Sequence, residues 1–99
     1  MVFTLKIETP SEPIITSISE PLRVPVESTV YLRCEATGTP APQIRWTKNG
    51  RKFQIHDRFF LTKKYLKIED TTVEDSGYYG CWAVNVGGKT AKRVKAKIL

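Results

Sequence analysis

The sequence is short of several residue types, and each shortage excludes a class of protein. The 99-residue chain has two cysteines and one histidine, with no CxxC pair, so a zinc site is unsupported. No apolar run is long enough to span a bilayer, so membrane insertion is not expected. The start, MVFTLKIETPSEP, lacks a basic region followed by an apolar one and does not read as a signal peptide. A secreted form would therefore be a piece of a longer protein.

Acidic residues are in the minority, since 10 Asp and Glu face 16 Lys and Arg, for a net charge of +6. Between Arg45 and Lys67 there are eight basic residues and one acid, and from Lys89 onward there are five and none. This balance favours polyanionic partners, with an ordinary solvated surface as the alternative. Helix-turn-helix patterns, zinc spacings and single-strand aromatic platforms are absent, so nucleic-acid binding is not expected.

A set of residues suited to catalysis is also missing. His56 falls in an expected loop without an obvious partner, and the acids from Asp57 to Asp75 fall at turns or strand ends. An enzyme would need a nucleophile with a base, paired carboxylates or a metal. We expect a domain without enzymatic activity and without a cofactor, although the parent chain could be a receptor tyrosine kinase.

Helical periodicity is almost absent, and short runs of alternating apolar and polar residues take its place. Such alternation is typical of antiparallel sheets that pack face to face, which predicts an all-β sandwich. Prolines interrupt two early segments and favour the sheet edges for them. The predicted strands lie within 29–36, 43–50, 65–70, 77–85 and 89–99, with edge pieces within 12–19, 21–26 and 58–64.

The two cysteines, Cys34 and Cys81, lie 47 positions apart. Their spacing alone leaves two alternatives open, one disulfide or two buried free thiols. A bridge across this loop would stabilise the domain by roughly 4 kcal/mol on the chain-entropy model. It would also indicate an oxidising compartment.

One set of residues resembles an immunoglobulin domain: Cys34, Trp46 twelve residues later, and the run Asp75-x-Gly77-x-Tyr79-x-Cys81. The stretch GTPAPQIRWTKNG and the short middle of the chain are similar to the I-set type. The resemblance covers residues 13–99 and implies a two-sheet antiparallel sandwich. Residues 1–12 are then expected to be a linker or an extended N-terminal arm.

The resemblance also implies structural roles for particular side chains. A Cys34–Cys81 disulfide would join the two sheets, and Trp46 would pack against it. The hydroxyl of Tyr79 would make a corner hydrogen bond. The remaining roles are an Asp75–Arg58 ion pair at the base of the sandwich and a core position for Leu66.

Two stretches resemble particular receptor families. GTPAPQIRWTKNGRKF is similar to the second immunoglobulin domain of fibroblast growth factor receptors, and DTTVEDSGYYGC is similar to Ror-type receptor kinases. Neural adhesion receptors and muscle proteins of the titin class share similar phrases. The growth factor receptors carry a heparan-sulfate-binding basic run before the first cysteine. Here that stretch is PVESTVYLR, with only Arg33, so heparin binding does not carry over from the motif.

Trp82 is the first candidate functional residue. Because Cys81 must point inward, strand alternation turns Trp82 outward. In an immunoglobulin sandwich this strand would be the middle strand of its sheet, between the strand of Trp46 and the last strand. Exposed Trp, Tyr and Arg are enriched at binding hot spots, which predicts a protein-binding face. The alternative is that the stems of Arg45 and Lys95 simply cover the indole. The predicted face consists of Trp82, Tyr78, Arg45, Arg93 and Lys95.

A second candidate is a basic cluster in the middle of the chain. Its charge would suit heparan sulfate or an acidic protein. By default such residues are solvated turn positions. The cluster consists of Arg51, Lys52, Lys63 and Lys64.

Two functional hypotheses follow from the sequence. The first is an extracellular module of a receptor or adhesion protein that recognises a protein ligand or a neighbouring immunoglobulin domain. The second is a structural spacer in a cytoplasmic muscle or cytoskeletal protein, with reduced thiols. The absence of an N-x-S/T site mildly favours the second hypothesis, and the placement of both cysteines favours the first.

Overall fold

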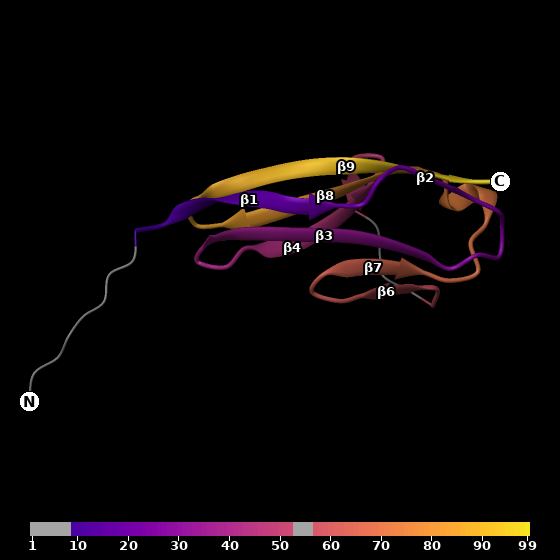
Figure 1. Cartoon of the computed structure of the whole chain (residues 1–99), viewed down its shortest axis with the longest axis horizontal. Helices are drawn as coiled ribbons and strands as arrows, with labels where there is room; N and C mark the ends of the chain where they lie inside the picture. Colours follow the sequence, from indigo (N-terminus) through magenta and orange to yellow (C-terminus); the bar gives the residue numbers. More distant parts are fainter. Residues whose placement is uncertain (1–8, 53–56) are drawn as a thin grey trace, which may run out of the picture.

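The computed structural model describes residues 9–52 and 57–99 and shows two β-sheets packed face to face (Figure 1). The all-β sandwich predicted from the alternating runs is therefore confirmed. The four-stranded sheet contains, in order, β1 (Ser11–Ile18), β3 (Val30–Thr39), β7 (Tyr65–Ile68) and β6 (Phe59–Leu61). The five-stranded sheet contains, in order, β2 (Leu22–Val24), β9 (Gly88–Ile98), β8 (Gly77–Asn85), β4 (Gln43–Lys48) and β5 (Arg51–Lys52).

The strand directions correct one expectation. All neighbouring strands are antiparallel except β2, which pairs parallel with β9. The sandwich is therefore mixed rather than wholly antiparallel. Pro21 lies between β1 and β2, where the chain passes from one sheet to the other, and it has no N–H to donate to a ladder. The proline-bearing segments and β6 do lie at sheet edges, as expected.

The core lies between the sheets and consists of the inward residues of each strand. Leu32, Leu66 and Tyr79 are fully buried, and Trp46 lies directly across from Cys81 on the neighbouring strand. At 25–30 cal/mol per Å² of apolar area removed from water, such burial is the main favourable term in folding. The outward residues of the same strands remain exposed or half-buried.

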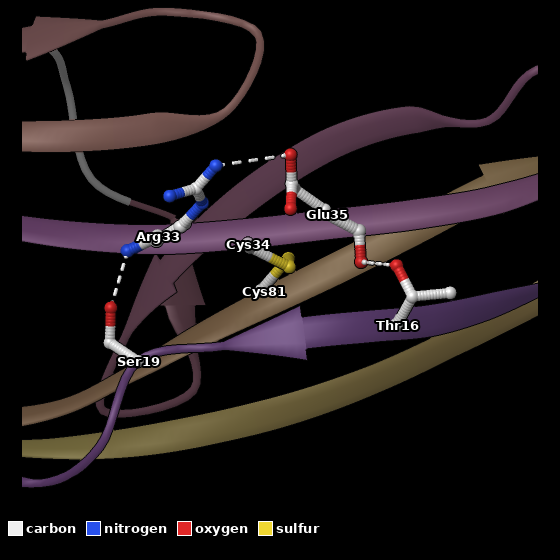
Figure 2. The surroundings of a disulfide bond; sticks show 6 residues. All are labelled: Thr16, Ser19, Arg33, Cys34, Glu35 and Cys81. Atoms are coloured by element: carbon white, nitrogen blue, oxygen red, sulfur yellow. Dashed lines mark hydrogen bonds and ion pairs between the residues drawn. A yellow bond between two sulfur atoms is a disulfide. The ribbon is translucent and has the colours of Figure 1, made fainter.

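Cys34 and Cys81 form a disulfide that joins β3 of one sheet to β8 of the other, with Cα atoms 6.5 Å apart. This resolves the alternative left open by the spacing. Figure 2 shows that β3 is also tied to the first segment of the chain on both sides of the bridge. The backbone N–H of Arg33 donates to the Ser19 hydroxyl at 2.6 Å, and the Thr16 hydroxyl donates to the Glu35 carbonyl at 3.3 Å.

The first strand begins at Ser11, two residues before the expected start of the domain. The Ser11 hydroxyl accepts a hydrogen bond from the Thr39 N–H at 2.9 Å, and its carbonyl accepts one from the Asn85 side chain at 2.8 Å. Most of the expected arm lies in residues 1–8, outside the described part of the chain. The described chain enters the sandwich at one end and leaves it at the opposite end, where Leu99 lies (Figure 1).

Candidate functional site

Three of the residues expected to have structural roles, Arg58, Asp75 and Tyr79, meet near η1 (Val73–Asp75). Arg58 donates two hydrogen bonds to the carboxylate of Asp75, from Nη1 at 2.9 Å and Nη2 at 3.1 Å. The hydroxyl of Tyr79 donates to the backbone carbonyl of Asp75. This cluster links the start of β6, the η1 turn and β8.

The charge of Asp75 is stabilised although its carboxylate is almost fully buried. Burial by itself raises the pKa of Asp75. Hydrogen bonds from Arg58 and from the Thr72 backbone N–H, together with the positive charge of Arg58, outweigh burial and hold that pKa below its ordinary value. Asp75 is therefore ionised at neutral pH and paired with Arg58.

Trp82 and Tyr78 lie on the outer face of β8, the middle strand of the five-stranded sheet. Trp82 is 37% exposed and Tyr78 is 41% exposed. Cys81, between them in sequence, is fully buried. The structure therefore places both rings on the solvent side, away from the disulfide, as strand alternation predicts.

The cations around these rings differ from those expected. Arg45 and Ala91 are the direct cross-strand neighbours of Trp82, and the Lys89 ammonium lies 5.8 Å from its ring centre. Arg93 and Lys95 instead lie over Tyr78, at 4.4 and 5.9 Å from its ring centre. The expectation that the stem of Lys95 covers the indole of Trp82 is therefore wrong. The β8–β9 hairpin pairs Asn85 with Gly88, and in this register Ala91 lies opposite Trp82 and Arg93 lies opposite Gly80.

The surface between Tyr78 and Trp82 is hollowed. A depression of about 590 Å³ lies there, with Gly80, Ala91 and Arg93 also in its lining. Thr47 is the cross-strand neighbour of Gly80. A Cβ atom on Gly80 would lie 2.5 Å from the Thr47 hydroxyl, so only glycine leaves room for this side chain. A second, largely apolar depression of about 430 Å³ lies on the far side of Trp82, lined also by Arg45, Leu61 and Val84. Trp82 thus lines both depressions.

The five-stranded sheet is strongly basic. Its strands contain ten of the 16 Lys and Arg residues and none of the ten acids. The two candidate sites predicted from the sequence contain only five of these ten residues and divide those five between them. The ten are Arg23, Arg45, Lys48, Arg51, Lys52, Lys89, Lys92, Arg93, Lys95 and Lys97.

The predicted polyanion cluster is split between the two sheets. Arg51 and Lys52 form β5 at the edge of the five-stranded sheet, next to β4. Lys63 and Lys64 lie in the turn between β6 and β7 of the other sheet, where the Lys64 ammonium is 3.6 Å from the Glu35 carboxylate. The cluster is therefore two separate basic pairs, of which one belongs to the basic sheet.

Neither a metal-binding cluster nor a membrane-spanning helix is present in residues 9–52 and 57–99. No group of three or more His, Cys, Asp and Glu side chains there is arranged to hold a metal ion. No helix in that part of the chain has the length and apolarity needed to cross a membrane. His56, the only histidine, lies outside the described residues.

The framework of disulfide, Trp46 and Tyr79 corner matches a known family over most of the chain. The model of the immunoglobulin I-set domain matches residues 13–98. The chain belongs to the immunoglobulin I-set family. Hemicentin-2 of Mus musculus is 30% identical over 83% of this chain, and Contactin-3 of Rattus norvegicus is 30% identical over 90% of it. The chain spans only 2% and 9% of the length of these two relatives.

Solved structures give the same fold. Titin domain M7 superimposes with a TM-score of 0.87 at 28% identity, covering 93% of this I-set domain and 98% of that chain. The N-terminal Ig1-2 module of the Drosophila receptor protein tyrosine phosphatase DLAR superimposes with a TM-score of 0.83 at 34% identity. That match covers 92% of this domain and 47% of the DLAR chain. The I-set domain is therefore similar to modules from a receptor and from a muscle protein alike.

Proposed function

We propose that this I-set domain is a non-catalytic protein-recognition module in the extracellular part of a cell-surface receptor or adhesion protein. Its binding surface is the outer face of the five-stranded sheet. The observation that carries the proposal is the pair of exposed rings, Tyr78 and Trp82, on the central strand with a hollow between them. Aromatic residues and arginine near the middle of a surface are the composition of binding hot spots.

The extracellular location is supported by the disulfide and by two relatives. Structural disulfides persist in oxidising environments and are rare in the cytosol. The DLAR module belongs to a receptor, and the extracellular domains 3-5 of Drosophila OTK match this domain at 31% identity with a TM-score of 0.81.

A spacer in a muscle or cytoskeletal protein is the second candidate function. Chicken smooth-muscle myosin light chain kinase is 37% identical over 74% of this chain. The likeness to titin M7 favours the same class. In a spacer the two thiols would stay reduced, and the exposed rings of β8 would contact neighbouring domains of the same array.

Binding to a panel of recombinant ectodomains tests the proposed face. We expect the I-set domain to bind at least one ectodomain of the panel. Trp82→Ala should weaken that complex by about ten-fold or more, as is typical of a hot-spot residue. The matched control is Tyr31→Ala, because Tyr31 is an aromatic residue of 55% exposure on the opposite sheet. A ligand lost by Tyr31→Ala and kept by Trp82→Ala would move the site to the four-stranded sheet and overturn the proposal.

Labelling of intact cells tests the location. We expect the natural chain to react with a membrane-impermeant amine reagent, because most of its lysines are exposed. We also expect no free thiol at Cys34 or Cys81 before reduction. A chain that stays unlabelled until the cells are lysed, with both thiols free, would support the spacer function instead.

A further inference from the structure

We propose that the outer face of the five-stranded sheet binds an acidic polypeptide, with its carboxylates placed on either side of an apolar centre. This inference rests on the proposed function and adds the chemistry of the partner. The juxtaposition that carries it is the apolar strip of β8, which contains Tyr78, Trp82 and Val84, between two basic flanks on β9 and β4–β5.

The flanks carry positive charge that no acid of the described residues neutralises through an ion pair. Strand register places Lys89, Arg93, Lys95 and Lys97 on the outer side of β9, and Arg45 and Lys52 on the outer side of β4 and β5. Within residues 9–52 and 57–99, no acid forms an ion pair with any of these six side chains. Like charges on one face raise the local potential and attract an anionic surface from a distance.

The uncharged strip between the flanks distinguishes a polypeptide from a linear polyanion. The outer residues of β8 are Tyr78, Gly80, Trp82 and Val84, and Ala91 faces Trp82 from β9. An apolar, aromatic centre with charged residues at the rim is the anatomy of protein–protein interfaces. A sulfated glycan is held mainly by a line of cations, so the two rings would add little to its binding.

Arg93 is placed to join the two kinds of contact. Its guanidinium lies 4.4 Å from the centre of the Tyr78 ring and lines the hollow above Gly80. An arginine stacked on a ring keeps its planar edge for a carboxylate and loses less freedom on binding. A partner could insert an apolar side chain beside the Trp82 ring. A carboxylate next to that side chain in sequence would then reach the Arg93 guanidinium.

The test uses three defined probes, because no natural partner is identified. These are poly-glutamate, a glutamate–tyrosine copolymer with about one tyrosine in five residues, and a heparin-derived oligosaccharide. Amide chemical-shift mapping of the I-set domain locates each contact, and titration measures each Kd at low salt. We expect the copolymer to bind about ten-fold more tightly than poly-glutamate and to shift amide signals of β4, β8 and β9.

Two charge-reversing substitutions distinguish binding at this face from attraction by the net charge of the domain. Arg93→Glu and Arg33→Glu both change the net charge by the same amount, but Arg33 lies on the four-stranded sheet. We expect Arg93→Glu and Trp82→Ala each to weaken copolymer binding by about ten-fold, and Arg33→Glu to weaken it less than two-fold. Thermal unfolding of each variant checks that it is folded.

Four results would overturn the inference. Equal losses for both arginine reversals would show attraction by net charge alone. Tighter binding of the heparin probe with no effect of Trp82→Ala would show a glycan surface. Absence of shifts on the five-stranded sheet would show that this face takes no acidic polypeptide. An identified ectodomain that needs Trp82 but not Arg93 would uphold the proposed function while overturning this inference.

Discussion

Two hydrogen bonds, of 2.9 and 3.1 Å, join the guanidinium of Arg58 to the carboxylate of Asp75 at the η1 turn. Asp75 is 4% exposed, so its charge has little contact with water. The same arginine donates to the backbone carbonyls of Glu69 and Asp70, and the same aspartate accepts from the N–H of Thr72. The pair therefore fastens the end of β7 and the η1 turn to the start of β6.

Replacement of Arg58 by methionine should destabilise the domain by about 3 kcal/mol at neutral pH, because it leaves a buried carboxylate without its counter-ion. Methionine keeps much of the side-chain volume, so the loss reports the charge pair rather than a cavity. Urea unfolding at pH 7 gives the free energy of unfolding. A loss below about 1 kcal/mol would show that the pair behaves as an ordinary surface ion pair.

The same variant should reveal a dependence on pH. In the natural domain the pKa of Asp75 lies below its ordinary value of 3.8, so its stabilising effect is complete above that value and is lost as the pH falls through the lowered pKa. Without Arg58 the pKa of Asp75 rises. The stability difference between the two proteins should therefore be largest at neutral pH and shrink as the pH falls from the raised pKa of the variant to the lowered pKa of the natural domain. A difference that stays constant with pH would contradict this origin.

Replacement of Tyr79 by phenylalanine isolates the corner hydrogen bond. The Tyr79 hydroxyl is buried and donates to the carbonyl of Asp75, and burial raises the pKa of this phenol. We expect a loss of about 1–2 kcal/mol in the free energy of unfolding, since a buried carbonyl is left without that donor. Tyr78→Phe on the same strand is the control, because Tyr78 faces solvent and should change stability by less than about 0.5 kcal/mol.

The orientation of side chains could be predicted from the sequence, since strand alternation depends only on local geometry. If the side chain of Cys81 points into the core, that of Trp82 must point to solvent, whichever strands lie beside β8. Register could not be predicted in the same way. A turn centred on Gly87 and Gly88 would pair Trp82 with Arg93, whereas the observed turn at Val86 and Gly87 pairs it with Ala91. One residue at the turn thus moves every cross-strand neighbour by two positions.

The basic character of the five-stranded sheet needed the sheet order as well. Arg23, Arg45 and Lys97 lie far apart in sequence and reach one sheet only because β2, β4 and β9 belong to it. The family resemblance implied the disulfide and the Arg58–Asp75 pair, because those positions belong to its motif. It could not imply the basic face, because outward residues are not part of the framework.

Removal of the disulfide should cost about 4 kcal/mol, since the bridge closes a long loop between Cys34 and Cys81. The double variant Cys34→Ala/Cys81→Ala should therefore show a much lower urea midpoint, and reduction of the natural domain should produce a similar change. An unchanged midpoint after complete reduction would mean that the bridge adds little to stability. That result would also weaken the argument for an oxidising compartment.

The two tryptophans form a matched pair for separating folding from binding. Trp46 is 7% exposed and belongs to the core cluster, whereas Trp82 is 37% exposed on the outer face of the neighbouring strand. Trp46→Ala should cost about 3–5 kcal/mol through the cavity that it leaves, and Trp82→Ala less than about 1 kcal/mol. Urea unfolding of both variants, followed by tryptophan fluorescence, measures the difference. A large loss for Trp82→Ala would mean that its indole is part of the fold, and its role in recognition would then have to be tested with the milder Trp82→Phe.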